Sequence, residues 1–70
     1  MQCPRCDGQG IVEKLRVRST GEILYVCDEC EATWLETEKI SIDSFRDFTT
    51  YMRSIGLKGL LPEIEIITSE

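Results

Sequence analysis

Four cysteines, arranged as two C-x2-C pairs, constrain the fold of this chain more than any other feature. Cys3 and Cys6 form the first pair, Cys27 and Cys30 form the second, and 20 residues lie between the pairs. This arrangement falls within the C-x2-C-x15–20-C-x2-C spacing of zinc sites. A C-x2-C on a tight turn places two sulfurs on the same side of the backbone, so two such turns supply the four corners of a tetrahedron. The spacing predicts one Zn²⁺ with all four cysteines as ligands.

The length of the chain explains why such a site is needed. A domain of 70 residues buries too little surface for a hydrophobic core alone to give more than marginal stability. The cysteines can staple it as two disulfides in an oxidising compartment or as metal ligands in a reducing one. The stretch "CPRCDGQG" at residues 3–10 lacks the apolar run of a signal peptide. We therefore expect a soluble, cytoplasmic metal protein; disulfides and an iron site, the latter the runner-up, remain alternatives.

The segment between the cysteine pairs has the pattern of a β-hairpin. Two runs rich in β-forming residues, Ile11–Val17 and Ile23–Val26, flank the turn "RSTGE", in which Gly21 tolerates a positive φ. A hairpin returns the chain to its starting end and brings the two cysteine turns together. After the second pair, Ala32–Glu36 predicts a third short strand.

The second half of the chain contains no cysteine and has a helical pattern. Four apolar residues recur at helical spacing and predict a helix at about residues 42–55: Phe45, Phe48, Met52 and Ile55. Ser44 with Asp47 resembles a capping box, Asp43 is a competing N-cap, and Gly56 suits the C′ position. The alternation at Glu63–Thr68 predicts a last strand that either pairs with the hairpin or lies on the outside. We expect one α+β domain, with residues 37–70 packed on residues 1–36.

The first half of the chain resembles a known class. "CPRCDG", a hairpin, "CDEC" and a short strand resemble a zinc ribbon, in which two C-x2-C knuckles clamp one zinc beside a small antiparallel sheet. The family knuckle usually has the pattern C-P-x-C-G, whereas here Asp7 separates Cys6 from Gly8. "CPRCDGQG" also matches the C-x-x-C-x-G-x-G repeat of cysteine-rich chaperone domains. The second pair lacks both glycines of that repeat, which favours the ribbon.

The composition argues against catalysis. Four cysteines close the coordination shell of a zinc ion, whereas a catalytic zinc keeps an open position. The chain has no histidine and no fifth cysteine, so the usual nucleophile–base pairs are absent. We expect a non-catalytic protein.

The charge of the chain suggests the kind of partner. The formal charge is −5, from 13 acidic and 8 basic residues, which opposes general binding to nucleic acid and suits a basic protein. Five acidic residues form the candidate partner surface: Asp28, Glu29, Glu31, Glu36 and Glu38. Three basic residues form an alternative face for nucleic acid: Lys14, Arg16 and Arg18.

The chain as a whole, a ribbon followed by "WLE…SFRDFTTYMRSIGL", resembles small bacterial zinc-ribbon proteins, some of which are similar to the acidic immunity proteins that neutralise nuclease toxins. This resemblance implies a protein-binding role, with a basic toxin as the partner. Trp34 and Tyr25 are stacking platforms if the partner is nucleic acid. In so small a domain they more often belong to the core, with Trp34 sealing the metal site or meeting Phe45 and Phe48.

Overall fold

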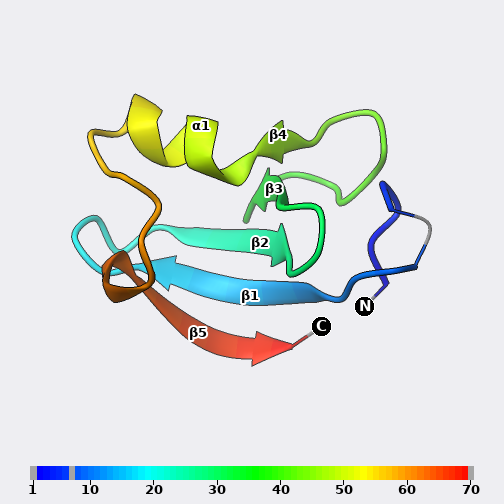
Figure 1. Ribbon diagram of the computed structural model, residues 1–70, viewed down its shortest axis with the longest axis horizontal. Coiled ribbons are helices and arrows are strands. Elements are labelled where there is room, and N and C mark those ends of the chain that lie inside the picture. The colour runs from blue at the N-terminus through cyan, green and yellow to red at the C-terminus, as the bar shows by residue number, and fades with distance from the viewer. Residues whose placement is uncertain (1, 7, 70) are drawn as a thin grey trace.

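The structure, a computed structural model, describes residues 2–6 and 8–69. These residues form a small α+β fold, in which one short helix lies beside a five-stranded antiparallel sheet (Figure 1). The strand order in the sheet is β4-β3-β2-β1-β5. Along the chain, the elements are β1 (Val12–Val17), β2 (Ile23–Cys27), β3 (Ala32–Leu35), β4 (Arg46–Asp47), α1 (Phe48–Ser54), the 3-10 turn η1 (Leu61–Glu63) and β5 (Ile64–Ser69).

The predicted hairpin and third strand are confirmed. β1 pairs with β2 so that Leu15 lies opposite Leu24, and β2 pairs with β3. Gly21 has a φ of +75° in the turn, a conformation that glycine adopts without the clash of a Cβ atom. The chain therefore returns to the end of the molecule where it began.

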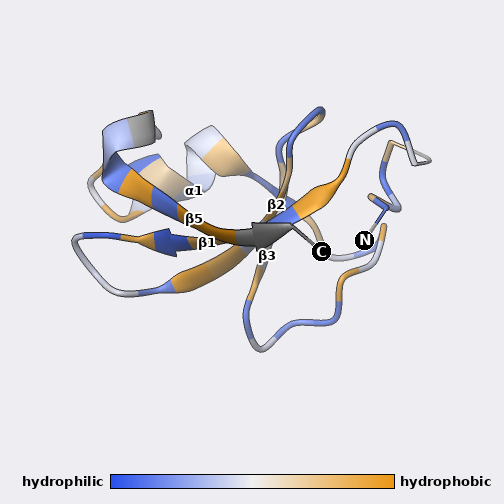
Figure 2. Ribbon diagram, turned by 90° about the horizontal axis from the view of Figure 1, so that it is seen from below, coloured by the Kyte–Doolittle hydropathy of each residue, from blue (hydrophilic) through white to orange (hydrophobic). Residues whose placement is uncertain are grey.

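The two faces of the sheet carry different cores. Side chains alternate between faces along a strand, and Figure 2 shows apolar and polar residues alternating along the strands. The face that carries α1 holds seven buried residues: Leu15, Val17, Leu24, Val26, Phe48, Met52 and Ile64. A second cluster contains Cys3, Val12, Cys27, Ala32 and Trp34. Val12 is three positions from Leu15, and Trp34 is one from Leu35, the partner of Leu24. The second cluster therefore lies on the opposite face.

The prediction of a helix at residues 42–55 is wrong at its beginning. α1 begins at Phe48, and its N-cap is Asp47, whose side chain accepts a hydrogen bond from the N–H of Thr50. Arg46 and Asp47 instead pair with β3, and the N–H of Phe48 donates to the carbonyl of Glu31. Phe45 consequently lies outside the helix and is 37 % exposed. Of the residues that helical periodicity alone assigns to the first turns, Arg46 and Asp47 join the sheet, and residues 42–45 form a turn and a loop before it.

The end of the helix follows the prediction. Gly56 has a φ of +85°, and its N–H donates to the carbonyl of Arg53. The N–H of Leu57 donates to the carbonyl of Met52. This pair of hydrogen bonds is the Schellman motif, in which glycine occupies the left-handed position.

The C-terminal strand completes the sheet. β5 pairs antiparallel with β1, with a register shift beside Leu15, so the sheet includes residues from both halves of the chain. The predicted strand Glu63–Thr68 is thus confirmed within one residue at each end, as an edge strand. Among the described residues, no helix has the length and apolar character needed to cross a membrane.

Candidate metal centre

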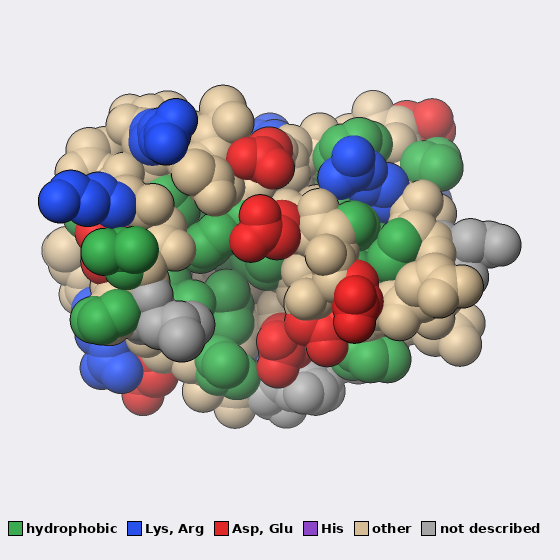
Figure 3. All heavy atoms as spheres, in the orientation of Figure 1, with side chains coloured by type: hydrophobic (Ala, Val, Ile, Leu, Met, Phe, Trp, Pro, Cys, Tyr) green, Lys and Arg blue, Asp and Glu red, His purple; other side chains and the backbone are tan. Residues whose placement is uncertain are grey.

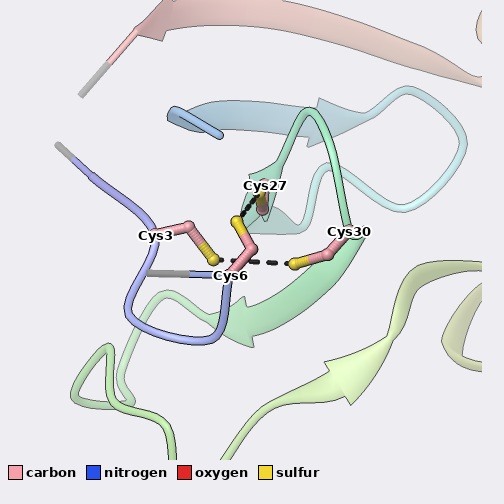
Figure 4. A group of neighbouring side chains, drawn as sticks. All are labelled: Cys3, Cys6, Cys27 and Cys30. Atoms are coloured by element: carbon pink, nitrogen blue, oxygen red, sulfur yellow. Dashed lines mark hydrogen bonds between the residues drawn. The ribbon is translucent and has the colours of Figure 1, made fainter. Parts of the chain in front are cut away.

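The two cysteine pairs meet in one cluster at the end of the sheet. All four sulfurs lie within 4.8 Å of one another, and they point toward a common centre from two separate turns (Figure 4). The Sγ atoms of Cys3 and Cys30 are 3.6 Å apart, as are those of Cys6 and Cys27. A tetrahedral ion with Zn–S bonds of ~2.3 Å holds its sulfurs ~3.8 Å apart. The four cysteines are thus positioned to bind a metal ion.

The four thiols are free rather than joined as disulfides. The distance of 3.6 Å between the nearest sulfurs is well beyond the ~2.05 Å of a disulfide bond. Cys3 and Cys27 are buried, whereas Cys6 and Cys30 are half-buried. The cluster therefore has one side against the core and one side near solvent.

Backbone hydrogen bonds hold the first knuckle. The N–H of Gly8 donates to the carbonyl of Cys3, and the N–H of Cys3 donates to the carbonyl of Gly10. Gly8 has a φ of +81°, as expected for a glycine that ends a knuckle. At Gly10, a Cβ atom would lie 2.4 Å from the Sγ of Cys27. Gly10 is thus a glycine because the Sγ of Cys27 occupies the space beside it. Asp7, which departs from the family pattern, lies outside the described residues.

The second knuckle achieves a similar turn without glycine. Glu31 has a φ of +61°, a left-handed conformation that is strained for a residue with a Cβ atom. Its N–H donates to the carbonyl of Cys27, and its carbonyl accepts from Phe48. The side chain of Asp28 accepts a hydrogen bond of 2.9 Å from the N–H of Ile11. The second knuckle is thus attached to the start of α1 and to the chain just before β1.

The thiols differ in acidity. Burial raises the pKa of the Cys3 thiol to about 12 and also raises the pKa of Cys6. Burial acts in the same sense on Cys27, but the N–H groups of Cys30 and Glu29 outweigh it and lower the pKa of that thiol. Backbone N–H groups that point at a sulfur favour the thiolate. A metal ion binds cysteine as the thiolate, so it must displace the protons of the thiols that are still protonated. Its binding therefore depends on pH.

Trp34 seals the inner side of the cluster. Its side chain is fully buried with Cys3 and Cys27, and its Nε1–H donates to the carbonyl of Ser41 at 2.9 Å. Trp34 thus packs on the cysteine cluster, the first of its two predicted places, and not on Phe48, which belongs to the cluster on the other face. Tyr25 packs partly buried against the Trp34 cluster.

The five acidic residues of the predicted partner surface do not form one patch. Asp28, Glu29 and Glu31 lie together in the second knuckle and are exposed, whereas Glu36 is exposed just beyond the far end of β3. Glu38 accepts hydrogen bonds from both terminal nitrogens of Arg46, at 2.5 and 2.9 Å, and another from the N–H of Leu35. Glu38 is therefore committed to contacts within the chain.

The basic residues of the alternative face are largely engaged. Lys14 and Arg16 lie on the same face of β1, since they are two positions apart. Arg16 forms an ion pair with Glu65 of β5, and the Nε of Arg18 donates to the carbonyl of Ile64. Arg16 and Arg18 thus hold β5 in place, which reduces the positive charge that this face offers to phosphate.

Arg5 and Arg46 have roles that the sequence analysis did not identify. Arg5, inside the first knuckle, donates to the carbonyl of Cys30 at 3.1 Å, and its guanidinium lies 4.5 Å from the centre of the Phe45 ring. Arg46 forms the paired contact with Glu38. Arg5 and Cys30 are 25 positions apart and Arg46 and Glu38 are 8 apart, so neither pair has the spacing of a strand or a helix turn. The position of Arg5 between Cys3 and Cys6 is the one feature of the sequence that places its side chain near the cluster.

Comparisons with known proteins identify no relative: no protein family, no curated protein and no solved structure matches this chain.

Proposed function

We propose that the cysteine cluster binds one Zn²⁺ as a structural ion and that residues 1–36 form a zinc ribbon. The supporting observation is a cluster of four sulfurs at the spacing of a tetrahedral thiolate site. Zinc and iron share this ligand set. Elemental analysis of the purified protein distinguishes them: one zinc per chain supports the proposal, and one iron overturns it.

In this proposal the protein is not an enzyme. Four cysteine ligands leave no open position on the ion for water or substrate. Outside the cluster the chain has neither histidine nor cysteine to serve as nucleophile or base. The zinc then holds the fold, and the function belongs to the surface of the molecule.

The surface suits a basic protein partner. The chain carries 13 acidic residues against 8 basic ones, and four thiolates that bind a divalent ion add two further negative charges. Three of the acidic residues, Asp28, Glu29 and Glu31, lie together in one exposed turn. We therefore propose a small acidic immunity or antitoxin-type protein, which neutralises a basic partner such as a nuclease toxin. Complementary charge accelerates such association and makes it sensitive to salt.

Charge reversal at the second knuckle tests this function. We expect immobilised wild-type protein to capture a specific basic protein from native extract at low salt and to release it at high salt. The Glu29→Lys variant should lose the capture while keeping its metal content and circular dichroism. Asp43→Lys is the matched control, because it makes the same change of charge at another exposed residue. Equal loss in both variants would show a general charge effect and contradict the proposed surface.

The immunity role has its own test. Co-expression of this chain with the toxin that it captures should restore growth to cells that the toxin otherwise kills, and the Glu29→Lys variant should fail to do so. If the captured protein is not toxic to cells, the protein-binding role stands and the immunity role is wrong.

The nucleic-acid alternative has less support from the structure. Arg16 and Arg18 already contact β5, so Lys14 is the member of the basic face for which the structure gives no such contact among the described residues. A mobility-shift assay at low salt addresses this alternative. Two results together would favour nucleic acid over protein. Binding should disappear in a variant lacking all three basic side chains, and the salt dependence should fall by about one unit for each phosphate contact that is lost.

A further inference from the structure

A groove of about 350 Å³ lies on the α1 face of the sheet, next to the metal centre. Figure 3 shows this face of the molecule hollowed near its middle, with apolar side chains in the hollow and acidic side chains along its right side. Five apolar residues line the groove: Leu15, Val26, Phe48, Ile64 and Ile66. Most of them are buried, but Ile66 is 56 % exposed. The groove therefore has an apolar floor that opens to solvent at β5.

The groove exists because α1 is short. The helix has seven residues, about two turns, and it begins at Phe48 on the floor of the groove. Val26 and Glu13, near the metal end of the sheet, lie opposite each other in the register of β1 and β2 and face the side that carries α1. No described helix covers this end of the sheet.

Three carboxylates surround the apolar floor. Glu13, Asp28 and Glu31 line the groove together with the ligand Cys27. None of the three carboxylates takes part in the ion pairs that the structure shows among residues 2–6 and 8–69. A loaded thiolate site beside them adds to the negative potential. The occupant with matching chemistry is a Lys or Arg side chain, whose aliphatic stem packs on apolar surface while its charged end reaches a carboxylate.

The edge of the sheet favours an extended occupant. β5 is the last strand of the sheet, and within the described chain it pairs only with β1. Its outer edge presents backbone N–H and carbonyl groups, to which a strand of a partner can bind. Such a strand would lie beside Ile64 and Ile66, with alternate side chains directed toward the groove.

We propose that this groove binds an extended segment of a basic protein partner, in which a Lys or Arg and a large apolar residue stand two positions apart and so face the groove together. This inference rests on the proposed function, since it names the surface and the recognised segment of that partner. The cation lies among Glu13, Asp28 and Glu31, and the apolar side chain covers Ile66.

The experiment uses the zinc-loaded full chain and a synthetic probe, acetyl-Lys-Thr-Leu-Thr-Val-amide, whose lysine, leucine and valine share one face of an extended strand; binding is followed by nuclear magnetic resonance. We expect saturable shifts at Leu15, Val26 and Ile66. The Ile66→Lys variant should bind the probe about tenfold more weakly, because it removes apolar contact and adds a like charge. Ile67→Lys is the matched control: Ile67 is the next residue of β5, is also exposed, and lies outside the groove. It should bind within about twofold of wild type.

Two further comparisons separate the charge from the apolar contact. Glu13→Gln should weaken binding about threefold, whereas Glu36→Gln, at an exposed residue outside the groove, should not. A peptide with serine in place of leucine and valine should bind more weakly than the probe. Equal binding of the two peptides, equal binding by Ile66→Lys and wild type, or no saturable shifts at the groove would overturn the inference.

The failure of the groove and the failure of the proposed function give different results. If Glu29→Lys abolishes capture of a basic protein from extract while Ile66→Lys retains it, the protein-binding function stands and the groove is not its site. If the probe binds at the groove as described but no basic protein is captured, the proposed function fails and the peptide site remains.

Discussion

At the scale of single residues, the closest constraint on the metal centre comes from Gly10. A Cβ atom at this position would lie 2.4 Å from the Sγ of Cys27 and 2.9 Å from the Cβ of Glu29. These atoms belong to the second knuckle, which hydrogen bonds attach to the rest of the structure. The knuckle has little freedom to retreat, so any side chain at Gly10 must displace a ligand.

The first prediction is that Gly10→Ala weakens metal binding by at least about tenfold, the lower end of what disturbed ligand surroundings cause. Competition with a chelator of known affinity measures this change. Gly21→Ala is the control, because Gly21 has open space around it but a φ of +75°. It should lower the free energy of unfolding by about 1 kcal/mol and leave the metal affinity unchanged. Equal metal affinities in the two variants would contradict the proposed contact.

A second prediction concerns the strained backbone at Glu31. Its φ of +61° is unfavourable for any residue with a Cβ atom, and glycine removes this strain at the expense of a more flexible unfolded chain. Glu31→Gly should therefore raise the free energy of unfolding by about 0.5–1 kcal/mol. Denaturant unfolding of the metal-loaded protein measures the difference. Glu29→Gly, in the same turn but without a positive φ, should lower the stability instead. A loss of stability in both variants would count against the strain.

At the scale of secondary structure, local pattern predicts some elements well and others poorly. The strands of the hairpin follow from alternation and from one glycine, both of which are local signals. The start of α1 does not, since it depends on the pairing of Arg46 and Asp47 with β3 and on the hydrogen bond from Phe48 to Glu31. These contacts bridge residues at least 13 positions apart, and helical spacing that includes Phe45 contains no information about them.

The ion pair between Glu38 and Arg46 supports the segment between β3 and β4 and gives a pH prediction. Hydrogen bonds from Arg46 and from the N–H of Leu35 lower the pKa of Glu38 to about 2, from 4.5. Because the folded pKa is below the unfolded value, the stabilisation is present above pH about 4.5 and is lost as the pH falls toward 2. Both side chains are partly exposed, so solvent screening limits the contribution to about 1 kcal/mol at neutral pH.

Comparison of wild type with Glu38→Gln across this pH range measures that contribution. The difference in free energy of unfolding should be about 1 kcal/mol at pH 7 and should shrink below pH about 4.5. Release of the metal at low pH affects both proteins, so their difference isolates the carboxyl group. Glu36→Gln, at an exposed residue, should match wild type throughout. A difference that does not change with pH would mean that the ionisation of Glu38 is not its source.

At the scale of the whole molecule, the cysteine spacing predicts the end of the sheet where the site forms, but not the surroundings of the site. The two knuckles meet because an antiparallel hairpin separates them, and the sequence shows that hairpin. The groove beside Cys27 is lined by residues of β1, β2, α1 and β5, and the contact of Arg5 with Cys30 forms where the two knuckles meet. Glu13 lies at the groove because it shares a face of β1 with Leu15. The sequence does not show that this face borders a groove, because the groove depends on where β5 and α1 pack.

The proposed structural role of the metal leads to the last prediction. β1 contributes Val12 to the cluster around the cysteines and Leu15 and Val17 to the cluster beneath α1. A chain of this length is marginally stable without a staple, and metal-binding energy in such domains is also folding energy. Removal of the metal should therefore disorder β1 and, through it, the clusters on both faces of the sheet.

A strong chelator should shift the fluorescence of Trp34, which is the only tryptophan and is fully buried, to longer wavelength, and added zinc should reverse the shift. Amide hydrogen exchange should show loss of protection in β1 and, at the same chelator concentration, in α1. If the Trp34 signal changes while α1 stays protected, residues 37–70 hold their structure independently of the metal. If neither changes, the cysteine cluster is not the staple of the fold, because a chain stabilised by bound metal must respond to its removal.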